Sequence, residues 1–203
     1  MTLIGMQRAE ASGGVAPLLV LAVGNPSRGD DALGPLFVLR LGEVLRAEID
    51  AGRLELLTDF QLQVEHALDL AGRQQVVFVD ASLSALAPFS FEPLTAVRDQ
   101  SATSHAMSPA AVLATMAAIG LAAPPRAGVL AIRGERFELG DGLSEAANRH
   151  LDAAVRFFVR EVCKAPLDPA KTSGEAAGLL IEIEGIVQGV GFRPWVYRVA
   201  TAL

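Results

Sequence analysis

The chain has 203 residues, of which 51% are hydrophobic and 20% are charged, and its formal net charge is −6. This balance predicts a packed globular protein rather than a disordered chain, and the acidic excess does not favour nucleic acid or an anionic membrane surface as a partner. Its one cysteine, Cys163, cannot form an internal disulfide, and no stretch resembles a signal peptide or reaches the roughly 18–20 apolar residues of a membrane span. We therefore expect a cytoplasmic protein.

Strands and helices are predicted to alternate along most of the chain. Continuous apolar runs predict buried strands at residues 17–23, 53–58, 75–80 and 128–132, and a further strand at 89–97 contains Pro93, which favours a sheet edge. Helical spacing of apolar residues predicts helices at 32–51, 62–71, 108–120 and 144–163, and three of them end at a glycine: Gly52, Gly72 and Gly120. This alternation predicts an α/β fold with an open, mostly parallel twisted sheet of about five strands and helices on both faces.

Composition divides the chain into three parts. The α/β domain is predicted at residues 17–163, and residues 164–178, rich in Pro, Ala and small polar residues, are predicted to form a linker. Residues 179–203 form a short C-terminal appendage with a motif of its own.

Three candidate metal ligands follow separate predicted strands. Asp31 follows the first strand, Asp59 ends the second, and His105 precedes the helix at 108–120. Open parallel sheets place their sites beyond the carboxyl ends of the strands, and two carboxylates with an imidazole suit nickel or zinc. The structural alternative is that these residues only cap helices or hold loops, and we expect the neighbouring Asp30 to cap the helix that follows it.

These segments resemble the hydrogenase maturation proteases. Gly24–Pro35, with its Gly-Asn turn and two acidic residues, is similar to the N-terminal signature of that family. The segment around Asp59 is similar to its second acidic motif, and residues 75–80 and 104–109 are similar to its third strand and histidine segment. The resemblance covers residues 17–160 in the right order.

The resemblance implies an endopeptidase that removes the C-terminal peptide of a nickel–iron hydrogenase large-subunit precursor after nickel insertion. Asp31, Asp59 and His105 would be both the metal-recognising and the catalytic residues, with nickel supplied by the substrate and no organic cofactor. Other hydrogenase maturation proteins are possible partners. A non-catalytic nickel-sensing or hydrogenase-binding module remains the alternative, because it would use the same residues.

Other catalytic arrangements find little support in the sequence. It contains no Gly-x-Ser-x-Gly elbow and no HExxH zinc motif. Cys163 is expected to serve in packing, His66 to be structural, and His150 to lie on a helix surface. Water activated by a metal or a carboxylate is therefore the favoured nucleophile. The loop at Gly24 lacks the GxGxxG pattern, and Pro26 removes an amide that a phosphate cradle would use, so a dinucleotide site is not expected.

The appendage resembles a different protein family. Residues 185–193, Gly-Ile-Val-Gln-Gly-Val-Gly-Phe-Arg, are similar to the first strand and anion-binding loop of an acylphosphatase domain, in the form found at the start of hydrogenase maturation carbamoyltransferases. The loop would offer backbone N–H groups, and Arg193 a cation, to a phosphate. The segment is a truncated acylphosphatase-like fragment, because a core needs more strands than these residues supply. Acyl or carbamoyl phosphate chemistry is accordingly not expected.

Ending the chain at Lys164 should leave precursor processing intact, because few contacts are expected to cross a linker of this composition. The full chain should not hydrolyse acyl phosphates. Mass spectrometry of the precursor, run with full and shortened chains, checks the first point, and a phosphate-release assay checks the second. Loss of processing on truncation would show that residues 179–203 contribute to the reaction.

Overall fold

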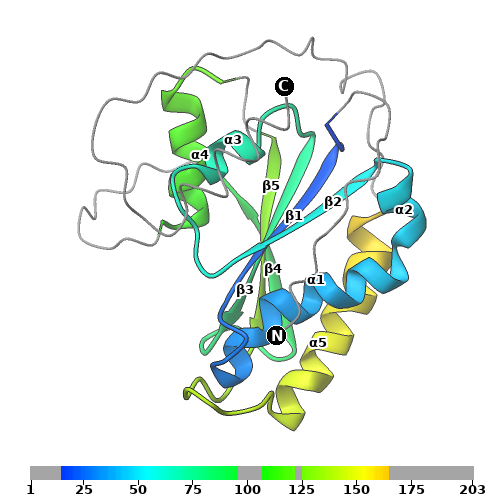
Figure 1. Cartoon of the computed structure of the whole chain (residues 1–203), viewed down its shortest axis with the longest axis vertical. Coiled ribbons are helices and arrows are strands. Elements are labelled where there is room, and N and C mark those ends of the chain that lie inside the picture. Colours follow the sequence, from blue (N-terminus) through cyan, green and yellow to red (C-terminus); the bar gives the residue numbers. More distant parts are fainter. Residues whose placement is uncertain (1–14, 96–106, 122–124, 165–203) are drawn as a thin grey trace. The chain divides into compact units, whose positions relative to one another are not determined.

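The computed structural model describes residues 15–95, 107–121 and 125–164 (Figure 1). The strands are β1 (Leu18–Val23), β2 (Leu54–Asp59), β3 (Gln75–Ser82), β4 (Phe89–Leu94) and β5 (Arg126–Arg133). The helices are α1 (Leu33–Val44), α2 (Arg46–Asp50), α3 (His66–Asp69), α4 (Pro109–Ala118) and α5 (Glu145–Phe157), with a 3-10 turn η1 (Gly29–Ala32) and a π-helical turn η2 (Phe158–Val162). His105 and residues 165–203 lie outside the described residues.

The five strands form one open sheet in the order β2-β1-β3-β5-β4. The pairings of β1, β2, β3 and β5 are parallel, whereas β4 pairs antiparallel to β5. The α/β fold predicted from the sequence is thus confirmed, including the edge position of the strand that contains Pro93. A proline is tolerated there because it has no N–H to donate to a further strand.

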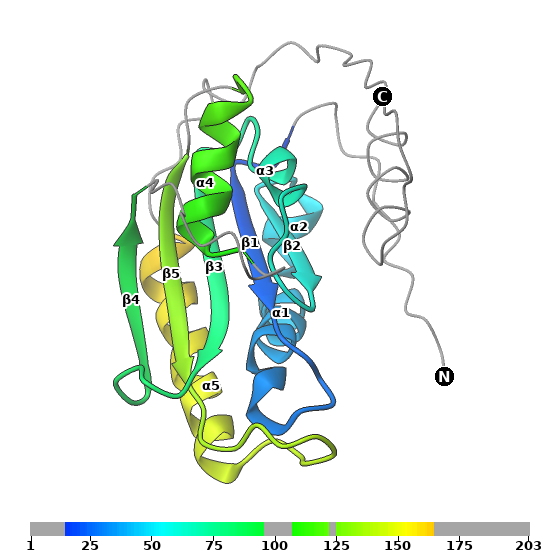
Figure 2. The ribbon, with the colours of Figure 1, turned by 90° about the vertical axis from the view of Figure 1, so that its left-hand side faces the viewer.

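Helices cover both faces of the sheet and create two cores (Figures 1 and 2). All six residues of β1 are buried, which explains why its sequence is continuously apolar. Alternate residues of β1, beginning with Leu18, pack with α1 and α5. The others, beginning with Leu19, pack with α3 and α4. Each face therefore buries a side-chain layer of its own, as the period of two in a strand requires.

Several helices differ from the sequence prediction. The helix predicted at 32–51 is interrupted at Leu45, which separates α1 from α2. The helix predicted at 62–71 shrinks to the single turn α3, and the N–H of Gln63 before it donates to the His66 ring at 2.9 Å. The last helix ends in the π turn, where the N–H of Cys163 donates to the carbonyl of Phe158 at 2.9 Å. The glycines expected at helix ends, Gly52, Gly72 and Gly120, all have positive φ.

Two glycines bring the start of α1 against the end of β1. A Cβ on Gly34 would lie 2.1 Å from the carbonyl oxygen of Val23, so only glycine allows this approach. Gly24 has φ of +144°, and a Cβ there would lie 2.0 Å from the carbonyl oxygen of Asp31. The turn after β1 therefore holds Asp31 directly beside the strand end.

In the described part of the chain, no helix has both the length and the apolar character needed to cross a membrane.

Candidate functional site

The carboxyl edge of the sheet carries three acidic residues from separate connections. Val23, the last residue of β1, pairs with Asp59 of β2, and Ala22 pairs with Val79 of β3. Asp80 is consequently level with Val23, so Asp59 and Asp80 flank the end of β1 on its two sides. Strand alternation directs both side chains, like that of Val23, to the face covered by α3 and α4.

Asp31 reaches the same edge from the turn after β1. Its Oδ2 accepts a hydrogen bond of 2.9 Å from the backbone N–H of Asn25. The side-chain oxygen of Asn25 accepts from the N–H of Ser27 at 2.9 Å, which confirms that this asparagine bonds its own local backbone as its position in the turn predicts. The half-buried Asp31 carboxylate is therefore held in one orientation.

Asp80 lies within electrostatic reach of Asp31. Asp80 is open to solvent on one side, but protein atoms surround its other sides, and this desolvation raises the pKa of Asp80 to about 6, with a further contribution from the negative charge of Asp31. The N–H of Ala81 opposes the shift by donating to Asp80 at 2.8 Å. The carboxyl edge of the sheet therefore holds two carboxylates that repel each other, and a bound cation would neutralise their charge.

Asp30 has a different role from its neighbour Asp31. It is fully buried, and its carboxylate accepts from the N–H groups of Glu135, Arg136 and Ser144 and from the Ser144 hydroxyl, at 2.7–3.0 Å. The expectation that Asp30 caps the helix after it is wrong, because the N-cap of α1 is Ala32 and no side chain caps that helix. Burial alone would raise the pKa of Asp30, but the bonds from these groups outweigh burial and lower it.

Asp59 is held by a backbone group and faces a buried histidine. Its Oδ1 accepts from the N–H of Phe60 at 2.6 Å, and its Oδ2 lies 3.4 Å from Nε2 of His66. The His66 side chain is 1% exposed, whereas the Asp59 side chain is 30% exposed. His66 is structural in the sense expected from the sequence, since it is part of the packed interior, but its ring also adjoins a candidate site residue.

His105 lies outside the described residues, so the structure does not test whether it joins Asp31 and Asp59. Among residues 15–95, 107–121 and 125–164, no three His, Cys, Asp or Glu side chains are close enough to hold one metal ion. The sequence interpretation left out Asp80 as a site residue. The signal that could have found it is the same one that selected Asp59, an acidic residue at the end of a buried strand.

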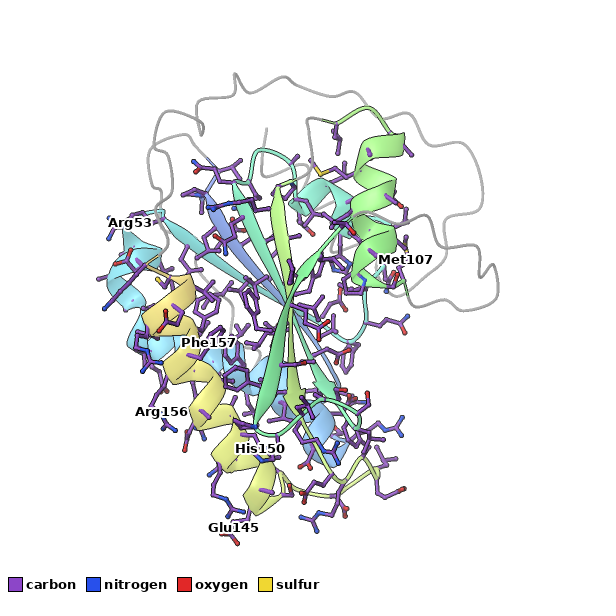
Figure 3. All side chains as sticks on the ribbon, turned by 180° about the vertical axis from the view of Figure 1, so that it is seen from behind. Arg53, Met107, Glu145, His150, Arg156 and Phe157 are labelled. Carbon is purple, nitrogen blue, oxygen red and sulfur yellow. The ribbon has the colours of Figure 1, made fainter. Side chains whose placement is uncertain are left out.

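The remaining candidate groups lie elsewhere. Cys163 packs against the core beside α5, and burial raises the pKa of its thiol, so a nucleophilic role is disfavoured. His150 is on α5, on the other side of the sheet from Met107 at the start of α4 (Figure 3), and its Nδ1 bonds with the carbonyl of Arg133 at 2.8 Å. It is thus half-buried and bonded to the end of β5, not a free helix-surface residue as expected.

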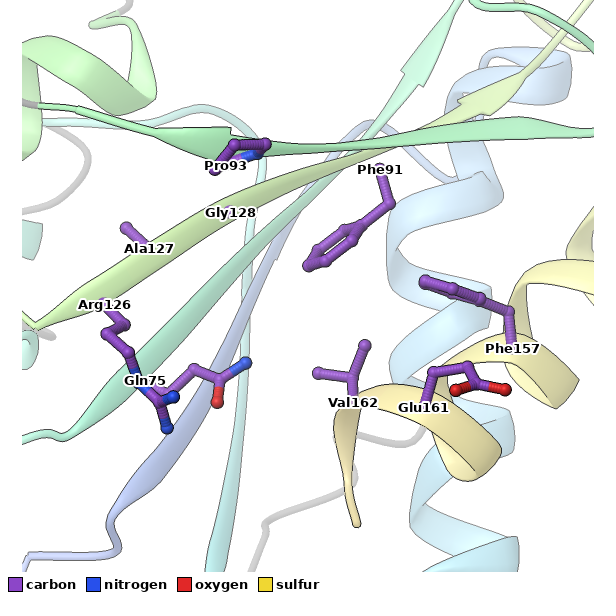
Figure 4. A pocket seen from close by; sticks show the side chains of 9 residues that line it. All are labelled: Gln75, Phe91, Pro93, Arg126, Ala127, Gly128, Phe157, Glu161 and Val162. Atoms are coloured by element: carbon purple, nitrogen blue, oxygen red, sulfur yellow. The ribbon is translucent and has the colours of Figure 1, made fainter. Parts of the chain in front are cut away.

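A pocket lies at the opposite end of the sheet from the acidic edge. It is lined by the apolar side chains of Phe91, Phe157 and Val162 and by Gln75 and Arg126 at the starts of β3 and β5 (Figure 4). Because it adjoins the amino ends of the parallel strands, it does not belong to the candidate site.

The fold of the main body is similar to that of solved hydrogenase maturation proteases. Hydrogenase maturating endopeptidase HybD from E. coli matches with a TM-score of 0.50 and 24% identity, over 68% of this chain and 87% of that one. [NiFe] hydrogenase maturation protease HybD from Thermococcus kodakarensis matches with a TM-score of 0.50 and 21% identity, over 69% and 95% of the two chains. HycI from the same organism matches with a TM-score of 0.50 and 18% identity, over 72% and 92%.

At these identities the likeness establishes the fold of the main body, and it agrees with the resemblance seen in the motifs. No curated protein matches the chain in sequence. The family model for acylphosphatase matches residues 179–203, which confirms the resemblance of the C-terminal motif. The boundaries of the linker and of this fragment remain predictions.

Asp30→Asn should lower the free energy of unfolding at pH 7 by about 2 kcal/mol, because an amide places its NH₂ against groups that are themselves donors. The folded pKa of Asp30 is lowered, so its contribution is present above the unfolded pKa and is lost as the pH falls through the folded value. The difference from the parental protein should therefore shrink in acid. Urea unfolding at several pH values measures it, with the exposed Asp141→Asn as control. An equal difference at every pH would contradict this account.

Asp31→Asn should lower the pKa of Asp80 towards its ordinary value, because the like charge beside it is removed. Titration of the Asp80 carboxyl carbon by NMR in both proteins measures the shift. Glu138→Gln, a change of charge at an exposed position, should leave the pKa of Asp80 where it is. An unchanged pKa in Asp31→Asn would mean that the two carboxylates do not face each other.

Proposed function

We propose that this protein is an endopeptidase that removes the C-terminal peptide of a nickel–iron hydrogenase large-subunit precursor after nickel insertion. The observation that carries the proposal is the charge-coupled pair Asp31 and Asp80 at the carboxyl edge of a sheet with the fold of hydrogenase maturation proteases. The same edge carries the orienting bonds that hold Asp31 in place.

Asp31, Asp80 and His105 are the proposed ligands of the nickel carried by the precursor. This set differs from the sequence-based set, Asp31, Asp59 and His105, in its second carboxylate. Asp80 is preferred because desolvation and, to a lesser extent, the charge of Asp31 raise its pKa and a bound cation would stabilise its ionised form, whereas Asp59 faces His66. Carboxylate and imidazole donors suit nickel, and three ligands from the protease leave coordination positions for the precursor.

The inclusion of His105 is supported by the residue two places after it. The N–H of Met107 donates to the carbonyl of Leu62 at 3.0 Å, which fixes the chain beside the loop that follows Asp59. The proposal of His105 as a ligand therefore rests on its place in the sequence, two residues before Met107.

Hydrolysis of the precursor requires an activated water. In the proposed reaction, Asp59 accepts a proton from water, the water oxygen bonds to the scissile carbonyl carbon, and the C–N bond then breaks as the proton passes to the leaving amine. Asp59 suits this role because it lies at the same edge and part of its side chain is exposed. Nickel held by the precursor would place the scissile bond against this group, so that cleavage follows metal insertion.

The second candidate function is a nickel-sensing or hydrogenase-binding module without catalysis. It would use the same acidic edge and would form a complex with the precursor without shortening it. Mass spectrometry of a nickel-loaded large subunit, incubated with this protein, separates the two functions. A lower mass supports the peptidase, whereas an unchanged mass within a stable complex supports the binding module.

Processing should be abolished by each of three substitutions: Asp31→Asn, Asp80→Asn and His105→Ala. Asp31→Asn should change the free energy of unfolding by no more than about 0.5 kcal/mol, since polar groups near solvent contribute little to the core. Asp80→Asn should stabilise the protein at pH 8, because the raised pKa of Asp80 makes its ionised form unfavourable in the folded state above pH 6. Glu138→Gln should process at the parental rate. If a substituted residue leaves the rate unchanged, that residue is not part of the site.

A further inference from the structure

The His66 ring is buried next to a carboxylate that reaches solvent. His66 begins α3, its side chain is 1% exposed, and its Nε2 has no conventional hydrogen-bond partner among the described residues. The neighbouring acceptor is Oδ2 of Asp59, at 3.4 Å. A buried polar atom without a conventional partner is uncommon in native proteins and calls for an explanation.

The other ring nitrogen determines where the proton lies. Nδ1 of His66 is 2.9 Å from the backbone nitrogen of Gln63, which donates to it, and 3.3 Å from the Gln63 carbonyl oxygen. Because the shorter contact requires a lone pair on Nδ1, the proton of the neutral ring is assigned to Nε2. Oδ2 of Asp59 lies 3.4 Å from this nitrogen, in a contact that is not a conventional hydrogen bond.

Asp59 is then held from two directions. The N–H of Phe60 donates to Oδ1 at 2.6 Å, and the ring of His66 lies behind Oδ2. The backbone carbonyl of Asp59 also accepts from the N–H of Gly24 at 3.1 Å, which joins the ends of β2 and β1. The carboxylate is therefore held by groups on its protein side, while 30% of the Asp59 side chain is exposed.

We propose that His66 is a positioning residue that, through Nε2–H, orients the Asp59 carboxylate toward the carboxyl edge of the sheet. The imidazole lies behind the carboxylate and away from solvent, so it acts on the reaction only through Asp59. The kinetic consequence rests on the proposed function, whereas the orientation itself does not.

The orientation can be measured without any substrate. Ring ¹⁵N shifts of His66 at pH 8 should show a protonated Nε2 and an unprotonated Nδ1. Asp59→Asn should shift the Nε2 resonance, and Asp141→Asn, in the exposed loop before α5, should not. Protonation at Nδ1, or an Nε2 signal insensitive to Asp59→Asn, would overturn the proposal. This result stands even if the parental protein cleaves no precursor, an outcome that would refute only the proposed function.

The effect on catalysis is measured with two substitutions of His66. His66→Leu removes the donor and should lower kcat for precursor processing by about 10- to 100-fold with KM unchanged, the size seen when a group orienting a site residue is lost. His66→Gln, whose amide places a donor near the Nε2 position, should recover most of that loss.

Matched changes at His150, the half-buried histidine on α5, serve as controls. His150→Leu and His150→Gln should leave kcat at the parental value, because that ring bonds to Arg133 on the other side of the sheet. Parental kcat in His66→Leu would overturn the positioning role. Equal loss in His66→Leu and His66→Gln, accompanied by a matching fall in thermal stability, would show that His66 acts only in packing, and it too would overturn the proposal.

Discussion

The buried carboxylate of Asp30 is the interaction on which the candidate site depends. Four donors from the connection between β5 and α5 converge on it, and they lie more than 100 residues further along the chain. A buried charge is tolerated only when such bonds replace its lost hydration. Because Asp30 is also bonded through its own N–H to the carbonyl of Arg136, the turn that carries Asp31 cannot move independently of the loop before α5.

The adjacent residues Asp30 and Asp31 have different surroundings and different roles in the candidate site. Asp30 points into the protein, where hydrogen bonds hold it ionised, and Asp31 points to the edge, where its charge contributes to the raised pKa of Asp80. The glycines on either side permit this arrangement, since side chains at Gly24 and Gly34 would meet backbone atoms. An edge fixed in this way would need little further ordering to bind the cation proposed for it.

The local sequence was sufficient to predict several helix ends and the buried strands. The buried strands, the glycine helix ends and the Ser108 N-cap of α4 all agree with the prediction, because these patterns follow from the backbone and from burial on both faces. The helix predicted at 62–71 is longer than the single turn observed, because apolar spacing does not fix where a helix begins and ends.

The sequence by itself determined the fold class, the two acidic positions that follow β1 and β2, and the motif that matches the acylphosphatase family. Only the tertiary structure decided what each acidic residue does. Asp30 supports a distant loop, Asp80 joins the edge beside Asp31, and Asp59 faces His66. The physical reason is that burial and charge coupling depend on neighbours across the sheet and between loops, and the spacing of residues along one chain does not encode those neighbours.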